Sequence, residues 1–338
     1  MTRTLTRLLA VALLVITGAC GATSSAHSAS GGGLVDIGAG LRGPEGTTAT
    51  EVSTGLEHVA ALATDADGTV WAGTAAYDDT GTDAVYRLVD GGDPVAVIGS
   101  LHTVLGLLWH DGELYVASAG GIVAYGGFDG TTFATHRTVL ALPADVGEVN
   151  GLVLGADGRL LVGVSSPCDS CDPTLDESAA ILSIATTGGD ATDYASGIRA
   201  PISLVYRPGT DDLYVTMNQR DDLGDATPGD WLSIVTSGQD WGFPACYGQD
   251  DEACADQPEP VAELDPHAGL SGLAFTGDTA LVAEWATSEV KAVALRDGDT
   301  VTTYLTGLKN PMPLLTDADG TVLVGDWTTG TVYRITVA

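Results

Sequence analysis

Basic residues are scarce in this chain of 338 residues. Only 13 lysines and arginines stand against 45 aspartates and glutamates, which gives a formal net charge of −32. Nucleic-acid binding requires basic side chains that neutralise phosphates, so this composition excludes it. The excess of carboxylates is explained either by solubility or by calcium binding in acidic loops, and composition alone favours solubility.

Catalytic motifs of fixed spacing are missing as well. The sequence contains no GxSxG, HExxH or P-loop motif, which argues against the hydrolase, zinc-protease and nucleotide chemistry that these motifs carry. No long helical period occurs after residue 34. Any site must therefore be sought in loops between strands.

The only segment that resembles a targeting signal is at the start of the chain. An apolar run, Leu8–Ile16, follows two arginines. It is too short to span a bilayer as a helix, but it fits the core of a secretory signal peptide. We therefore expect residues 1–19 to be a signal peptide and the protein to be exported.

Small residues and a cysteine follow this apolar run. The segment from Thr17 to Cys20 resembles the lipobox of bacterial lipoproteins, with Thr17 in place of the usual leucine. The resemblance implies a lipid on Cys20 and a flexible tether over 20–33. A membrane contact would then be through the lipid alone, at the outer face of the cell membrane. An ordinary signal peptide cut near Ala19, giving a secreted protein, is the alternative.

The other four cysteines form two local pairs, Cys168 with Cys171 and Cys246 with Cys254. A zinc site is the rival explanation, but only the first pair has the CxxC spacing and no histidine lies near either pair. Because an exported protein is in an oxidising compartment, we predict two disulfides.

One pattern recurs six times: an apolar strand, a turn with Asp or Gly, and a second apolar strand. The turn aspartates are 41 to 67 residues apart, at Asp67, Asp111, Asp157, Asp211, Asp278 and Asp319. Repeats of this length made of strands and tight turns are typical of propeller blades. We predict an all-β, six-bladed β-propeller of four-stranded antiparallel blades over residues 34–338. A pair of β-sandwiches would not explain the repeat.

The first repeat shows all four strands, at 59–64, 69–74, 84–89 and 94–99, whereas the last shows only three, at 312–316, 321–326 and 331–337. The segment 50–54, ahead of the first repeat, can supply the missing strand. Closure of the ring by this N-terminal strand would remove an open sheet edge.

Residues just before each innermost strand of a propeller gather around one end of the central channel. The residues at these positions are His58, His102, Glu148, Arg199, His267 and Asn310. Histidine and glutamate can act as bases, although a polar residue here can also simply cap a turn. Trp241 and Trp285 are candidates either for a ligand platform or for packing between blades, and for Trp327 we expect packing between blades.

Segments in the second half of the chain resemble the soluble quinoprotein glucose/sorbosone dehydrogenase family. The resemblance covers roughly residues 145–338, and the earlier repeats match by pattern only. It rests on Gly151–Gly158 with the following Ser-Ser-x-Cys-x-x-Cys, Gly197–Pro201, Asn218–Asp225, Trp241–Pro244, Pro266–Ala268 and Ala283–Trp285. Members of that family are six-bladed propellers that oxidise sugars with pyrroloquinoline quinone (PQQ) and calcium.

The resemblance implies roles for particular residues. Glu148 or His102 would take the proton of a sugar hydroxyl. Calcium would lie near Asp221 and Asp222, and PQQ would be bound by Arg199, Arg220, His267 and Trp285. Lys291 and Lys309 are further cations that we expect near the channel.

The sequence departs from the family at key positions. Gly147-Glu148 stands where the family has its catalytic histidine, and Ala200 replaces the asparagine that follows the family's arginine. Two hypotheses result: a PQQ-dependent sugar dehydrogenase, or a non-catalytic surface propeller that binds a glycan or a protein partner. In both cases we expect a monomer.

Overall fold

The computed structural model describes residues 33–78, 81–248, 252–296 and 300–337. The expected signal peptide (1–19), the expected lipid site Cys20 and nearly all of the tether lie outside these residues. One compact unit begins at Gly33. Its described part consists of strands and two short 3₁₀ helices, η1 (Gly224–Ala226) and η2 (Glu252–Cys254). Neither helix has the length and apolarity needed to cross a membrane.

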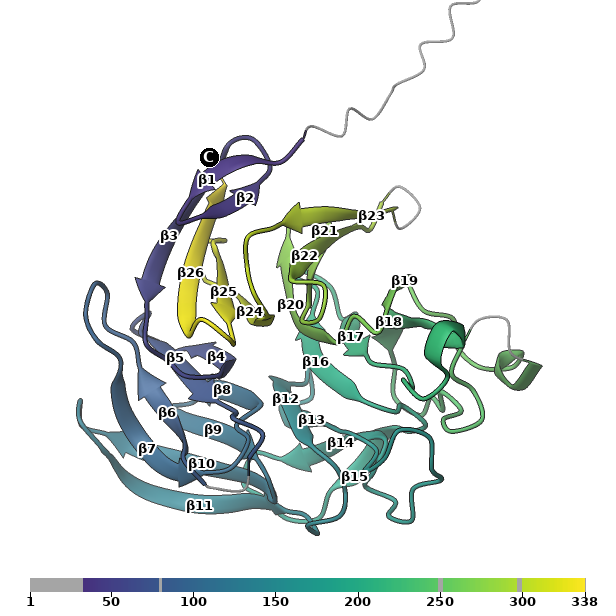
Figure 1. Ribbon diagram of the computed structural model, residues 1–338. Coiled ribbons are helices and arrows are strands. Elements are labelled where there is room, and N and C mark those ends of the chain that lie inside the picture. Colours follow the sequence, from purple (N-terminus) through teal and green to yellow (C-terminus); the bar gives the residue numbers. More distant parts are fainter. Residues whose placement is uncertain (1–32, 79–80, 249–251, 297–299, 338) are drawn as a thin grey trace, which may run out of the picture. The chain divides into compact units, whose positions relative to one another are not determined.

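Six four-stranded antiparallel sheets follow one another along the described chain, each forming one blade of a propeller (Figure 1). The all-β, six-bladed prediction is confirmed. Blades 1 to 3 contain β4 (Val59–Thr64), β5 (Val70–Thr74), β6 (Asp83–Arg87) and β7 (Val95–Leu101); β8 (Gly106–His110), β9 (Glu113–Ser118), β10 (Gly121–Phe128) and β11 (Phe133–Ala141); and β12 (Val149–Leu154), β13 (Arg159–Val164), β14 (Ala180–Ala185) and β15 (Thr192–Ala195). Blades 4 to 6 contain β16 (Pro201–Tyr206), β17 (Leu213–Met217), β18 (Gly229–Val235) and β19 (Ala262–Pro266); β20 (Leu270–Thr276), β21 (Thr279–Glu284), β22 (Glu289–Ala294) and β23 (Thr300–Leu305); and β24 (Pro311–Thr316), β25 (Val322–Asp326), β26 (Thr331–Val337) and β3 (Thr47–Ser53).

The repeated Asp/Gly turns join the first and second strands of the blades. In blade 1, the Oδ1 atom of Asp65 accepts hydrogen bonds from the main-chain N–H of Asp67 (3.0 Å) and of Thr69 (2.9 Å). Gly68 has φ +82°, a conformation that glycine adopts without steric cost. The repeat visible in the sequence is therefore the repeat of these turns.

The hydrophobic core is divided among the boundaries between blades. Each of six clusters of buried apolar side chains joins two successive blades, including the boundary between blades 6 and 1. Trp71 in blade 1, for example, is fully buried and packs with Val104, Leu107 and Leu114 of blade 2. A blade therefore buries its faces only when both neighbours are present.

Blade 6 takes its outermost strand from the other end of the chain. Strand β3 pairs antiparallel with β26, with Ala49 opposite Ile335, so the first and last parts of the chain lie side by side (Figure 1). The predicted closure by the N-terminal strand is confirmed. An additional hairpin, β1 (Val35–Gly38) and β2 (Leu41–Gly43), precedes it and was not expected. Main-chain hydrogen bonds between Arg42 and Thr306 attach this hairpin to the segment after blade 5.

The first strands of the blades, β4, β8, β12, β16, β20 and β24, surround a central channel with a volume of about 430 Å³. Three of these strands contain a glycine where the next strand comes very close. A Cβ atom at Gly106 would lie 2.4 Å from the Asn150 carbonyl oxygen, and one at Gly272 would lie 2.2 Å from the Leu314 nitrogen. Glycine therefore allows the innermost strands to approach one another.

Removing β3 tests whether the ring depends on its closure. A chain that begins at Gly55 also lacks the hairpin β1–β2, and it should lose more than about 3 kcal/mol of unfolding free energy relative to a chain that begins at Gly33. The core between blades 5 and 6 then loses Ile37, Leu41 and Ala49, the core between blades 6 and 1 loses Val52, and β26 becomes an open edge. Denaturant unfolding measures the stability, and size-exclusion chromatography should show self-association of the shorter chain. Equal stability and a monomeric shorter chain would contradict the closure.

Candidate functional site at the channel mouth

The channel end where the first strands begin is called the mouth here. Each connector into a first strand has at least one residue with positive φ within four positions of that strand, among them His58, Thr103, Gly147, Gly197, His267 and Gly307. Four of these connectors also carry a residue predicted for the site at or next to the positive-φ position. Histidine is among the residues that tolerate this conformation. Chain turning therefore explains part of the histidine pattern in the sequence.

Buried carboxylates hold the loops at the mouth in place. In blade 1, Asp83 accepts hydrogen bonds from the Ala76 N–H (2.9 Å) and, across the blade boundary, from the Thr103 N–H (2.7 Å). In blade 4, Asp230 accepts equivalent bonds from the N–H groups of Gln219 (2.8 Å) and Gly269 (3.0 Å). Each carboxylate thus links the loop after a second strand to the entry of the next blade.

Asp326 in blade 6 also anchors mouth loops, but it holds the entry of its own blade rather than that of the next one. It is buried and accepts hydrogen bonds from the main-chain N–H groups of Lys309 (2.7 Å) and Asn310 (3.3 Å), and from those of Thr328 and Thr329 in the following loop. Sequence reasoning missed Asp83 and Asp326. The signal that could have found them is an aspartate at the strand ends beside the mouth loop, at the start of the third strand for Asp83 and at the end of the second strand for Asp326.

Glu148 lies at the mouth with its side chain accessible to solvent. Burial by the surrounding protein raises its pKa, and the nearby charge of Arg199 opposes that shift. Gly147 sets the turn before it, because a Cβ atom there would lie 2.2 Å from the Ser165 carbonyl oxygen. A carboxyl group that is both accessible and flanked by protein suits proton exchange with a ligand hydroxyl.

Tyr77 is a mouth residue that sequence reasoning missed. It lines the channel with half of its surface exposed, and its φ is +55°. Burial raises the pKa of its hydroxyl, and the charges of Glu148 and Asp83 raise it further. The phenol is therefore protonated at neutral pH and can donate a hydrogen bond.

An aromatic row forms another part of the mouth. The His58 and Trp327 rings are 4.2 Å apart, and the Trp285 and Trp327 rings meet edge to face at 5.8 Å. The Trp327 Nε1–H donates to the Ala75 carbonyl (2.8 Å), which places it two residues from Tyr77. Trp285 is 38% exposed, and its carbonyl accepts a hydrogen bond from the Asn310 side-chain amide (2.9 Å).

The remaining aromatic and histidine candidates lie outside this row. Trp241 is only 1% exposed and packs on Trp231 inside the boundary between blades 3 and 4, so the platform interpretation was wrong for it. His102 is exposed, and its ring lies against Gly81. Among the described residues, no hydrogen bond or ring contact joins His102 to Glu148.

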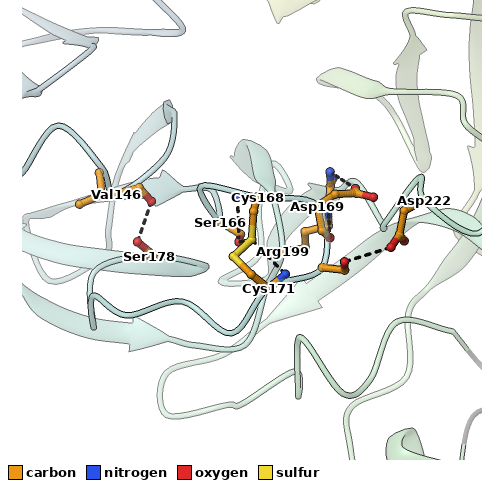
Figure 2. The surroundings of a disulfide bond; sticks show 9 residues. Val146, Ser166, Cys168, Asp169, Cys171, Ser178, Arg199 and Asp222 are labelled. Carbon is orange, nitrogen blue, oxygen red and sulfur yellow. Dashed lines mark hydrogen bonds and ion pairs between the residues drawn. A yellow bond between two sulfur atoms is a disulfide. The ribbon is translucent and has the colours of Figure 1, made fainter.

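Both predicted disulfides are present, Cys168–Cys171 and Cys246–Cys254. The first closes a short loop at the mouth, and Asp169 lies inside that loop (Figure 2). Its Oδ1 atom receives the Arg199 Nη2–H at 2.5 Å, and its carbonyl receives the Arg199 Nε–H at 3.0 Å. Arg199 is therefore already engaged with a carboxylate.

The acidic loop after β17 forms ion pairs of its own. Arg220 donates two hydrogen bonds to Asp222 (2.6 and 2.7 Å) and lies over the Tyr247 ring. This pairing lowers the pKa of Asp222. The structure thus joins Arg220, predicted to bind PQQ, to Asp222, predicted to bind calcium.

Asp221 contacts His267, another residue predicted for the site. The His267 Nδ1 atom is 2.8 Å from Asp221 Oδ1, and its Nε2 atom is 3.1 Å from the Gly224 carbonyl oxygen. The carbonyl and the carboxylate both raise the pKa of His267. Since both ring nitrogens face acceptors, the imidazolium form suits this position. Within the described ranges, no group of three or more His, Cys, Asp or Glu side chains is arranged to hold a metal ion.

The two lysines expected near the channel differ in their surroundings. Lys291 on β22 is within 4 Å of three carboxylates, those of Asp265, Glu284 and Glu289. Lys309 is exposed, and among the described side chains no carboxylate pairs with its ammonium group.

Comparison with known proteins shows similarity in fold. No protein-family model and no curated protein matches the sequence. The solved structures do contain similar folds. A calcium structure of a Trichoderma reesei carbohydrate-active enzyme of family AA12 has a TM-score of 0.73 and 18% identity, covering 88% of this chain and 97% of that one.

Two PQQ structures are also similar. The holo pyranose dehydrogenase PQQ domain of Coprinopsis cinerea gives a TM-score of 0.70 at 15% identity, covering 87% and 96% of the two chains. The PQQ-bound aldose sugar dehydrogenase of Streptomyces coelicolor gives 0.69 at 17%, covering 87% and 100%. The chain therefore has a dehydrogenase-like propeller fold, as the sequence resemblance implied.

The buried carboxylate of Asp230 predicts a pH dependence of stability. Burial raises its pKa to about 6, from an ordinary value of 3.8, although main-chain N–H groups partly offset the shift. Between these two pH values the folded state binds more protons than the unfolded state, so its contribution to stability falls as pH rises. The stability of the wild type relative to Asp230→Asn should fall by up to about 3 kcal/mol between pH 4 and pH 7. Denaturant unfolding at several pH values measures this difference, and a pH-independent difference would contradict the shift.

Proposed function

We propose that the mouth binds a small sugar. The observation that carries this proposal is the aromatic row of His58, Trp327 and Trp285, with rings 4.2 and 5.8 Å apart, on the same rim as Glu148 and Tyr77. Apolar faces of aromatic rings pack against the C–H faces of a sugar ring, while carboxyl and phenol groups bond its hydroxyls. The shared fold with sugar dehydrogenases supports the same ligand class.

Trp285→Ala tests the proposal. The exposed ring contributes to ligand contact more than to the core, so affinity for an aldose such as glucose should fall about tenfold or more, with the thermal midpoint little changed. Isothermal titration calorimetry of the whole protein with a panel of aldoses and short glycans measures the affinity.

His136→Ala is the matched control. His136 is also an exposed ring that stacks on an aromatic neighbour, Tyr125 at 5.9 Å, but it lies on β11 in the outermost position of blade 2. It should leave sugar affinity unchanged. Equal effects of the two variants, or no binding of any sugar to the wild type, would overturn the proposal.

Oxidation of the bound sugar with PQQ and calcium is the second candidate, and the PQQ-bound solved structures favour it. PQQ carries three carboxylates and needs several cationic partners. Here Arg199 is paired with Asp169 and Arg220 with Asp222, and the neighbouring Glu148 and Asp221 are also acidic. Lys291 is also paired with carboxylates, which leaves Lys309 as the one predicted cation without a carboxylate partner among the described side chains. One free cation does not fit the three carboxylates of PQQ, so sugar binding without oxidation is the function that we propose.

Adding PQQ with calcium to the purified protein separates the two candidates. We expect no change in the PQQ absorbance at micromolar concentration and no dye reduction with aldoses, because the mouth arginines already have carboxylate partners. Saturable PQQ binding together with sugar-dependent dye reduction would establish the second candidate instead.

The location and assembly of the protein also remain proposals. We propose an exported monomer, held on the outer face of the cell membrane by a lipid on Cys20 or released after cleavage near Ala19. A cell-surface glycan is then an alternative source of the sugar ligand. Mass spectrometry of the mature N-terminus identifies the lipid. If the lipid is present, Cys20→Ser removes its attachment site and should move the protein from the membrane fraction to the soluble fraction.

A further inference from the structure

Asp169 occupies an arrangement of donors that is suited to a ligand. Its carboxylate receives the Arg199 Nη2–H at 2.5 Å, and the Asp221 main-chain N–H lies 3.0 and 3.1 Å from its two oxygens. A guanidinium group together with a main-chain N–H is a common receptor for carboxylates. In this protein a carboxylate of the chain itself fills that receptor.

The local structure keeps Asp169 in this position. The Cys168–Cys171 disulfide closes the loop that contains it, and Figure 2 shows its side chain directed at Arg199 beside the sulfur atoms. The adjacent Ser170 hydroxyl donates to Asp222 (3.0 Å), which ties the same loop to blade 4. The remaining donor group of Arg199, Nη1, contacts the Asn218 carbonyl oxygen at 3.4 Å. All three nitrogens of Arg199 thus have partners within the protein.

We infer that Asp169 is a specificity-determining residue, whose carboxylate fills the anion site formed by Arg199 and the Asp221 N–H and thereby excludes acidic ligands from the mouth. This inference rests on the proposed sugar site and narrows its ligands to neutral sugars. An acidic sugar such as a uronate would have to displace Asp169. The carboxylate of the uronate would otherwise face Glu148 and Asp169, and neither Arg199 nor Arg220 would be available to pair with it.

Asp169→Asn in the full chain tests the inference. The variant keeps the size of the side chain and removes the charge, so Arg199 can pair with an added carboxylate. Affinity for glucuronate and for citrate should rise about tenfold or more over the wild type, as expected for a gained charge-assisted hydrogen bond. Asp172→Asn removes the same charge from an exposed residue next to the disulfide and should give no gain.

Two further variants complete the test. The double variant Asp169→Asn, Arg199→Gln should bind glucuronate and citrate no better than the wild type, because the guanidinium group is gone. If Asp169→Asn has a lower thermal midpoint than the wild type, Asp169→Ser replaces it in the test. The inference is overturned if folded Asp169 variants bind glucuronate and citrate no better than Asp172→Asn does. Glucose binding is measured in parallel. A failure of glucose binding alone would reject the proposed function, whereas an unchanged acid affinity would reject the role of Asp169.

Discussion

Apolar contact between neighbouring blades is the interaction on which the rest of this structure depends. Each of the six core clusters joins two successive blades, so a single sheet has no complete core of its own. The sixth boundary joins the two ends of the chain, because Leu323 and Val332 of blade 6 pack with Val59 and Leu62 of blade 1, and β3 completes blade 6 by pairing with β26. The closed ring then fixes the starting points of six strands around one channel, and the mouth takes its geometry from them.

The mouth is acidic, and its two arginines are neutralised locally. Asp169 is paired with Arg199, and Asp222 with Arg220, at 2.5 and 2.6 Å. The second pair brings together residues that the sequence resemblance assigned to two different ligands, PQQ and calcium. The arrangement favours neutral, hydroxyl-rich ligands over polycarboxylates, since burying further negative charge here would be unfavourable. The fold is shared with PQQ-binding dehydrogenases, whereas the ion pairs at the mouth disfavour PQQ, so the fold alone does not identify the ligand.

Local patterns in the sequence predicted the scaffold well. Turns such as Asp65–Thr69 are formed by hydrogen bonds within a few residues, so their repeat predicts the blades. The hairpin β1–β2 was missed because it is short and is held by a distant partner, Thr306.

The candidate site was predicted less completely, for the same physical reason. The positions of Glu148 and Arg199 follow from the repeat, but the partner of Arg199 lies 30 residues earlier, inside a disulfide loop. Tyr77 lacks any local signal, because it reaches the channel through a left-handed turn after β5. Trp241 illustrates the opposite error, since a tryptophan in a long loop proved to be core.

Two buried carboxylates, Asp83 and Asp230, fix the beginning of a mouth loop to the blade, so that the rest of the loop is not needed to hold the strands in place. Asp83 bonds the base of its loop at Ala76, and Asp230 does the same at Gln219, before the chain leaves the scaffold. Both also hold the entry of the next blade. The segments between these anchors can therefore change in length and sequence without shifting the strands. These segments can therefore be exchanged in protein engineering to change which ligand the propeller binds.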